Sequence, residues 1–586
     1  MMPSRRFSFG SQAALLAVTV TVVVSSACAK SDDGNLSGPP PLVDANCPAR
    51  CAADGRALVN CRDEVVTACD AHSSCIDNVC THGCEAAARG QSSVGCEYFA
   101  AKPSAYLFGE EGPKNDGSCY AVMVANTWNA PVEIQVEYDG QSIPSSYFRI
   151  PRGQGADLHY ELLPEGKLPS NELAVLFLAM EPKPPFSEEG LPLYIRCPET
   201  VGAAVLGSAA VRGTGKGKMF HIRTSAPVTA YDIYPYGGAK SYFPSASLLL
   251  PTSAWGTDGL VADGYHTSEL QAGAGAGTWF QVLASQNDTH LKIRPTLQLQ
   301  SVAGSPVVNP GEIGEYVLQA GEFLQFAGVE NADGTGVEAD KPVGIAGGAS
   351  CMVIPEGRPY CDTLHQNIPP IRHFGHQYVA TRYRDREPAE PERTPWLVLA
   401  AADGTVLTYD PPIPDAPTTL KRGEWKEFFS SGPFVVRTQD ESHPIYVASY
   451  MTGGSLVSTD MGDPEMVNVI PVGQYLSKYL FLTDPTYGNT NLVFTRAAVE
   501  GKFDDVELDC LGTVQGWQKV GNSNYEVAYV DLVKNGAPQG DCNNGVHRAS
   551  SNRPFALTVW GWDITASYGF PAGMGTKTLN QVPGIR

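Results

Sequence analysis

Basic residues are the scarce component of this chain. Only 18% of its 586 residues are charged, and 41 Lys and Arg stand against 62 Asp and Glu, for a net charge of −21. A body this acidic repels the phosphates of nucleic acid and of anionic lipid headgroups, so we expect neither as a partner. The acidic residues are spread along the chain and form no long acidic tail.

The motifs of common enzyme and cofactor sites are also missing. The sequence contains no HExxH, no GxSxG, no Walker loop and no Rossmann glycine pattern after a strand. We therefore expect no catalytic residue and no cofactor. A hydrolase with an unrecognised site is the weakest of the functions that we consider.

Two groups of residues have the composition of metal ligands. The first collects nitrogen and oxygen ligands in one segment: Asp362, His365, His373 and His376. The second supplies the hard oxygens that calcium prefers, without the spacing of an EF-hand: Asp460, Asp463 and Glu465. Neighbouring turn residues favour a connecting loop and a plain acidic turn, so we expect no metal at either place.

Long apolar runs are absent except at the start of the chain. Arg5 and Arg6 precede an apolar stretch from Ala13 to Val24, and small residues then lead to Cys28. This layout is typical of a secretory signal peptide and is too short for a comfortable membrane span. It is similar to a bacterial lipobox, with Ser25 where that motif prefers Leu, Val or Ile, so we expect Cys28 to be lipidated and the chain to be anchored at the outer membrane or cell surface. Simple secretion is the alternative. Cleavage after residue 27 removes the two arginines and changes the net charge from −21 to −23.

The cysteine count fits an oxidising compartment. Of the 15 cysteines, 14 remain when Cys28 is set aside, and an even number permits complete pairing. Eight lie in one short stretch, and their pairing stays open: Cys47, Cys51, Cys61, Cys69, Cys75, Cys80, Cys84 and Cys96. The other six predict three disulfides: Cys119–Cys197, Cys351–Cys361 and Cys510–Cys542. Zinc is the competitor in the eight-cysteine stretch, but the sequence has no CxxC pair, so we favour disulfides.

Composition divides the chain into five regions. After the signal peptide (1–27), a Ser-, Asp-, Gly- and Pro-rich tether (28–46) leads to a cysteine-rich module (47–96). So small a module cannot bury a sufficient core, and disulfides would replace it. A repeated β region (97–575) and a C-terminal tail (576–586) follow. The β region alternates β-branched and aromatic segments with turns that draw on the 60 glycines and 45 prolines of the chain.

The β region repeats four times. A small-residue strand, a glycine-led strand and an apolar strand introduced by proline recur in the same order, with closing strands that begin at Pro227, Pro342, Pro444 and Pro554. We expect four tandem, sandwich-like β units, with a propeller as the alternative. Six tryptophans occupy matched places in these repeats, where we expect core packing and consider sugar stacking as the alternative: Trp279, Trp396, Trp425, Trp517, Trp560 and Trp562.

The phrases between the units carry a family resemblance. They include AYDIYPYGGAKSYFPSASLLLPTSAWG from Ala230, CMVIPEGRPYCDTLHQNIPPIRHFG from Cys351 and ASYMTGGSLVSTDMGDPEMVNVIP from Ala448. Together with SVGCEYFA from Ser93, they resemble the IgGFc-binding-protein N-terminal domain family over about residues 93–575. The resemblance implies secreted or lipid-anchored bacterial proteins with a preceding cysteine-rich segment. Its name implies immunoglobulin binding in an animal mucus protein, and no binding residue follows from it.

These observations favour a non-enzymatic, surface-anchored binding or adhesion protein with an extracellular protein or glycan as its partner. Loops on a rigid β scaffold would carry recognition, and we expect the contact surface in the connecting loops 235–255, 347–375 and 451–470. The alternative is a structural, self-associating component of the cell envelope or extracellular matrix.

Overall fold

The structure is a computed structural model that describes residues 49–584 apart from short internal segments. These segments are 53–55, 71–72, 77, 106–116, 154–156, 183–186, 189–190, 193, 242, 266–276, 303, 329, 359–360, 388 and 390. The expected signal peptide, the tether, Cys28 and Cys47 lie outside the described residues. Within the described part no helix is long and apolar enough to span a membrane, and strands form most of the regular structure.

The cysteine-rich module is made of short strands and one helix. Its elements are β1 (Arg50–Cys51), β2 (Ala57–Val59), β3 (Val65–Ala68), β4 (Ser73–Ile76), β5 (Val79–His82) and α1 (Gly83–Arg89). β1, β2 and β3 form one small sheet, and β4 pairs with β5. Few of its side chains are buried, and disulfides Cys51–Cys75 and Cys69–Cys80 hold the strands together. Cys61 is disulfide-bonded as well. Cross-links thus replace a core in this module.

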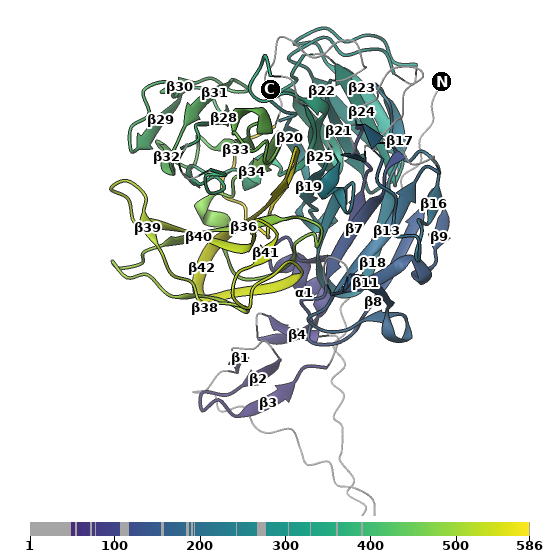
Figure 1. The fold of residues 1–586 in the computed structure, drawn as a ribbon, viewed down its shortest axis with the longest axis vertical. Coiled ribbons are helices and arrows are strands. Elements are labelled where there is room, and N and C mark those ends of the chain that lie inside the picture. Colours follow the sequence, from purple (N-terminus) through teal and green to yellow (C-terminus); the bar gives the residue numbers. More distant parts are fainter. Residues whose placement is uncertain are drawn as a thin grey trace, which may run out of the picture. The chain divides into compact units, whose positions relative to one another are not determined.

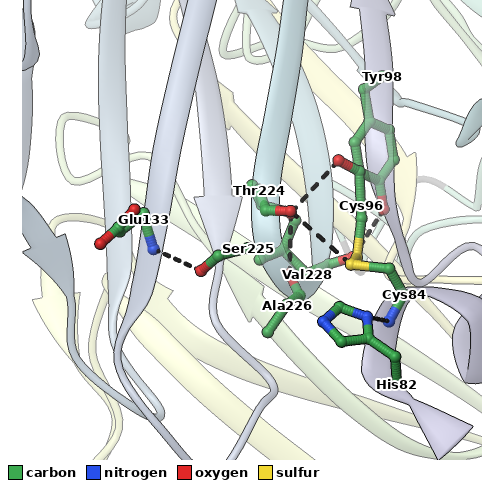
Figure 2. Close-up of a disulfide and its surroundings, with 9 residues drawn as sticks. All are labelled: His82, Cys84, Cys96, Tyr98, Glu133, Thr224, Ser225, Ala226 and Val228. Carbon is green, nitrogen blue, oxygen red and sulfur yellow. Dashed lines mark hydrogen bonds between the residues drawn. A yellow bond between two sulfur atoms is a disulfide. The ribbon is translucent and has the colours of Figure 1, made fainter. Parts of the chain in front are cut away.

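A third disulfide joins the module to the β region, as Figure 2 shows. Cys84 in α1 is bonded to Cys96 in β6 (Gly95–Ala100), and the Cys84 sulfur lies 3.8 Å from the Thr224 carbonyl oxygen. Beside it, the Tyr98 hydroxyl donates to the Val228 carbonyl oxygen at 2.6 Å. The Thr224 hydroxyl donates to the Ala226 carbonyl oxygen at 2.8 Å. α1 is therefore tied covalently to the first β unit.

Four β units follow, coloured from blue to yellow in Figure 1. The first contains β6, β7 (Tyr120–Ala125), β8 (Val132–Tyr138), β9 (Gln141–Ile143), β10 (Phe148–Arg152), β11 (His159–Leu162), β12 (Lys167–Leu168), β13 (Leu173–Met180), β16 (Val205–Leu206), β18 (Phe220–Tyr234) and β19 (Ser245–Leu248), with the small hairpin β14 (Ser187–Glu188) and β15 (Leu191–Pro192). The second contains β17 (Gly215–Lys218), β20 (Gly256–Leu260), β21 (Thr278–Ala284), β22 (Thr289–Arg294), β23 (Gly314–Leu318), β24 (Glu322–Gly328), β25 (Gly336–Met352) and β26 (Asp362–Ile368).

The other two units have the same plan. The third contains β27 (Gln377–Ala380), β28 (Thr394–Ala400), β29 (Thr405–Asp410), β30 (Thr419–Leu420), β31 (Trp425–Ser430), β32 (Phe434–Thr438), β33 (Ile445–Met451) and β34 (Glu465–Asn468). The fourth contains β35 (Leu476–Leu482), β36 (Asn489–Ala497), β37 (Val506–Leu508), β38 (Gly512–Thr513), β39 (Gln518–Lys519), β40 (Tyr525–Lys534), β41 (Ala537–Pro538), β42 (Val546–Asp563) and β43 (Ala566–Pro571). Short 3-10 helices connect strands: η2 (Ser145–Tyr147), η4 (Pro164–Gly166), η5 (Gly238–Lys240), η6 (Thr252–Ala254), η7 (Ile371–His373), η8 (Gly454–Leu456) and η9 (Val472–Gln474).

One long strand crosses between the two halves of each unit. In the first unit, β18 pairs with β8 up to Thr224 and with β7 from Thr229 onward. β25 and β42 change partners in the same way, whereas the third unit divides the strand into β32 and β33. A strand that passes from one sheet to another makes a corner of a sandwich. The units are therefore curled and sandwich-like, which confirms the predicted fold class.

The repeated prolines mark these corners. Pro227, Pro342 and Pro554 lie inside continuous strands, so the prediction that each proline begins a strand is wrong for three units. Only Pro444 precedes its strand, β33. Proline has no backbone N–H to donate to a ladder. Between its two pairing partners the strand makes no ladder hydrogen bond, so a residue without a backbone N–H is tolerated there.

Disulfides reinforce single units within the β region. Cys119–Cys197 lies in the first unit, Cys351–Cys361 in the second and Cys510–Cys542 in the fourth. These are the same pairs as the sequence analysis expected.

Two features connect units that are distant in sequence. β17 lies between strands of the first unit in the sequence, yet it pairs with β24 and so belongs to the sheet of the second unit. At the other end, Ser93 and Met574 bond reciprocally: the Ser93 amide donates to the Met574 carbonyl oxygen at 2.7 Å, and the Met574 amide donates to the Ser93 hydroxyl at 3.1 Å. The first and fourth units are thereby joined.

The segment after β43 continues along the other units. Gln474, in η9, is fully buried and binds this segment with both side-chain atoms. Its Nε2 donates to the Lys577 carbonyl oxygen at 2.7 Å, and its Oε1 accepts from the Lys577 amide at 3.0 Å. The Asn580 amide group then donates to the Ile371 and Phe374 carbonyl oxygens at 2.7 and 3.0 Å. Residues 572–584 are thus an ordered segment, which we call the C-terminal strap.

Replacement of Gln474 tests this strap. Gln474→Ala removes two hydrogen bonds, to the Lys577 amide and to the Lys577 carbonyl oxygen, each worth about 0.5–1.5 kcal/mol. We expect faster amide hydrogen exchange over residues 573–580 and a lower Tm. Gln515→Ala, at an exposed glutamine in the fourth unit, is the control. Unchanged exchange in the tail of the Gln474 variant would contradict the strap.

Candidate functional site

The connecting segments between units form the centre of the β region and not its surface. Segments 235–255, 347–375 and 451–470 contain β19, β26 and β34, and almost all of their described residues are buried or half-buried. β19 contacts β26 and β43, and β34 contacts the same two strands, so the four inner strands close a ring. The prediction that these segments are exposed recognition loops is therefore wrong. Their small residues allow this close approach: a Cβ at Gly347 would lie 1.8 Å from the Ala262 carbonyl oxygen.

Polar side chains hold the inner strands together. Ser245 in β19 donates to Glu465 in β34 at 3.1 Å and accepts from the His365 amide in β26 at 3.1 Å. Gln366 in β26 donates to the Ala246 carbonyl oxygen at 2.9 Å. These bonds pair polar atoms that are shielded from water, and they fix the register between units.

An aspartate–histidine pair lies at this centre. Asp232 in β18 is 3.0 Å from the His365 Nε2 through one oxygen and accepts from the Tyr120 hydroxyl at 3.0 Å through the other. Burial, followed by Asp232, raises the pKa of Tyr120 well above its ordinary value. Asp232 is 2% exposed and His365 4% exposed, so solvent does not reach the pair and it serves to join the first and second units. Sequence reasoning missed Asp232, although an acid inside the apolar phrase AYDIY was a signal.

The three acidic residues with the composition of calcium ligands are divided between surface and interior. Asp460 is exposed, whereas Asp463 and Glu465 are 1% and 0% exposed. Burial raises the pKa of Asp463 to about 8, against the opposing effect of Arg386, and raises the pKa of Glu465 well above its ordinary value. Among the described residues, the oxygen atoms of these three carboxyl groups do not converge as a metal site would require.

The histidines of the other candidate metal cluster also lie apart. His365 faces Asp232, whereas His373 in η7 accepts from the Arg372 side chain at 3.2 Å. Burial, assisted by Arg372, lowers the pKa of His373 to about 3. Among the described residues, the ligand atoms of Asp509, Cys510 and His547 do converge. Cys510 is bonded to Cys542, however, so its sulfur is not a thiolate ligand.

The matched tryptophans fall into two groups. Trp279, Trp396, Trp560 and Trp562 are fully buried, as expected for core packing. Trp425 and Trp517 are half-buried. Trp517 lies 3.9 Å from the Arg496 guanidinium, which stacks over its ring. One face of the half-buried Trp517 ring is therefore already covered.

An open groove lies on the outer face of the second unit. Its volume is about 650 Å3. The polar residues that line it are Lys216, His290, Lys292, Ser305, Glu315, Glu338 and Asp340. Ser305 lies in the segment between β22 and β23, and the others project from β17, β22, β23 and β25 next to the aliphatic side chain of Val317. Unlike the buried centre, this surface is accessible to another molecule.

The buried carboxyl groups generate a pH prediction. An aspartate with a pKa near 3.9 in the unfolded chain and about 8 at Asp463 binds its proton more tightly in the folded state. Its contribution to stability is complete below pH 4 and is lost as the pH rises to 8, by up to about 1.4 kcal/mol per pH unit. We expect Asp463→Asn to flatten the dependence of the free energy of unfolding on pH in this interval. Asp460→Asn, three residues away and exposed, should keep the wild-type slope. An equal slope in wild type and Asp463→Asn would contradict the assignment.

Comparison with known proteins agrees with the resemblance seen in the sequence. The sequence profile described as IgGFc binding protein matches residues 245–561, from β19 into the final residues of β42. A search of curated proteins found no match. The matched region includes most of the second and fourth units, the whole third unit and three of the four inner strands, β19, β26 and β34, so it covers most of the repeated architecture. Because the profile spans more than half of the chain, the protein belongs to the IgGFc binding protein family.

Proposed function

We propose that this chain is a non-enzymatic binding protein at the cell surface, and that it recognises a macromolecular partner through the groove of the second unit. Family membership supports the binding of a protein partner. The disulfides are typical of an extracellular protein. The observation that carries the proposal is the contrast between the sealed polar centre and the open, charged groove.

The groove uses side chains that the fold does not need. Along β22, Thr289, Leu291 and Ile293 point into the core while His290 and Lys292 are exposed. β23 alternates in the same way, with Glu315 and Val317 exposed. Alternate residues of a strand face opposite sides of a sheet. The lining of the groove can therefore vary without loss of packing.

The chemistry of the groove fits a protein partner. Lys216 and Lys292 face an environment that also contains Glu338 and Asp340, and the Lys216 ammonium donates to the Val317 carbonyl oxygen at 2.8 Å. Val317 is 39% exposed. Mixed charges around an aliphatic side chain steer and orient a complementary surface, whereas they would partly repel a ligand of one charge.

A lipid anchor at Cys28 would place this groove at the membrane surface. The anchor is supported by the apolar run that ends at small residues before Cys28 and by the Pro-containing tether that follows. Ala29 and Lys30 lack the acidic residue that favours retention at the inner membrane in similar lipoproteins, so the outer membrane is the proposed location. Self-association of the same surface, as in a structural envelope component, is the alternative function.

Site-specific crosslinking tests the groove. We expect a photoreactive residue in place of Val317, activated on intact cells in contact with extracellular material, to give a discrete adduct with a different protein. The control carries the same residue at Val406, which is 46% exposed on β29 of the third unit. A lysine pair reversal, Lys216→Glu with Lys292→Glu, should reduce the adduct at least tenfold. Equal adducts at both positions would contradict a role for the groove, and adducts with a second copy of this chain would favour the structural alternative.

Fractionation tests the anchor. Cys28→Ala removes the acceptor thiol, so the variant should move from the membrane fraction to the soluble fraction. Ser37→Ala in the same tether is the control and should stay with the membrane. If Cys28→Ala remains bound to the membrane after a high-salt wash, lipid anchoring at this residue is wrong.

A further inference from the structure

A second cavity lies where the first and fourth β units meet. Its volume is about 400 Å3, within the range of small-molecule sites. The first unit and the segment before it contribute Ser93, Val94, Thr127, Asn171 and Thr229, and the fourth contributes residues of β35, β42 and the segment after β43. We call it the inter-unit pocket. It is separate from the groove and uses none of its residues.

The charged side chains of the inter-unit pocket are both cationic. Lys478 and Arg548 line it, and no Asp or Glu does. Neither cation forms an ion pair with a carboxylate within the part of the chain that the structure describes. The Arg548 guanidinium donates to a neutral group, the Asn171 carbonyl oxygen, at 2.7 Å.

The nearest acidic side chains are already engaged. Asp509 accepts from the His547 ring at 3.0 Å and from the Arg548 amide at 2.9 Å. Glu507, opposite Ser550 on the next strand, accepts from the Thr513 hydroxyl. Neither lines the pocket. The charged side chains of the lining are therefore cations alone, and a bound anion would complement them.

Strand register sets the distance between the two cations. Lys478 is opposite Ser550, and Leu480 is opposite Arg548, on the antiparallel pair β35 and β42. Lys478 and Arg548 are thus diagonal neighbours on one face, with Cβ atoms roughly 7 Å apart. Their long side chains can converge on a single carboxylate. Arginine can bind both oxygens of that group, and lysine adds a third donor.

The rest of the pocket suits a sugar ring. Thr127, Asn171 and Ser550 are exposed at its rim and present a hydroxyl, an amide and a second hydroxyl. Val94, Leu476, Leu480 and Ala572 supply an apolar floor. A pyranose has an apolar face and a ring of hydroxyl groups, and it adds a carboxylate in hexuronic and sialic acids. We propose that the inter-unit pocket binds a carboxylate-bearing sugar residue of an acidic glycan.

Binding measurements on the full-length protein in detergent test this proposal. The probe is a hyaluronan tetrasaccharide, which alternates hexuronate and N-acetylhexosamine, and maltotetraose is the neutral comparison. We expect calorimetry to detect the acidic probe alone, with affinity that falls as salt concentration rises. Lys478→Gln and Arg548→Gln should each weaken binding by tenfold or more, the range of a charge-assisted hydrogen bond. Lys519→Gln, an exposed lysine on β39 of the same unit, should leave binding unchanged.

Two further variants separate a sugar site from a simple anion site. Thr127→Val should weaken binding of the tetrasaccharide and leave any competition by inorganic phosphate or sulfate unchanged. Lys478→Arg should retain binding, because it keeps the charge. Absence of binding by hyaluronan tetrasaccharide and by N-acetylneuraminate would overturn the proposal. It would also be overturned if phosphate or sulfate bound as tightly as the sugar, or if the Gln variants bound normally with an unchanged Tm.

Discussion

Each β unit depends on one strand that belongs to two halves of a sandwich at once. The first half of each of the strands β18, β25 and β42 pairs with an outer strand of its unit, and the second half pairs with strands that lie nearer the centre. In the third unit, β32 and β33 divide these two roles between them. The second half then carries an inner strand on its free edge, as β18 carries β19. The long strand turns at its proline, and this turn brings the inner strand that pairs with its second half to the centre. The ring of inner strands follows from this one constraint.

The centre is polar because it is crowded. The strands that meet in the ring bury polar side chains next to small residues, and hydrogen bonds between Ser245, His365 and Glu465 join them. Carboxyl groups such as Asp362 are buried there, and burial followed by Asp463 and Glu465 raises the pKa of Asp362 well above its ordinary value. Neutral carboxyl groups can be packed at a much lower free energy than charged ones. The acidic centre therefore acts in folding, and it has no access to a ligand.

Much of the architecture was visible in the sequence, since regular repeats depend on local chemistry. Four prolines at similar spacing marked the corners, and strand alternation marked the sandwich-like units. The connecting segments were misread for a physical reason. Segment 235–255 is rich in Gly, Pro, Ser and Ala, which is typical of loops, but β19 is held by residues more than 100 positions away, including His365 and Glu465. Local composition cannot reveal such partners, and the groove and the inter-unit pocket also join residues that only the folded chain brings together.

The same constraint decides where recognition can occur. The inner strands of all four units contact each other, and the C-terminal strap occupies η9 and η7, so substitutions there would disturb several units at once. On the outer strands every second side chain faces water, so a substitution there does not disturb several units. In the second unit these free positions line the groove, and at the junction of the first and fourth units they leave two cations unpaired. In this chain, substitutions on the outer faces and at the unit junctions can therefore alter a ligand site without disturbing the packing at the centre.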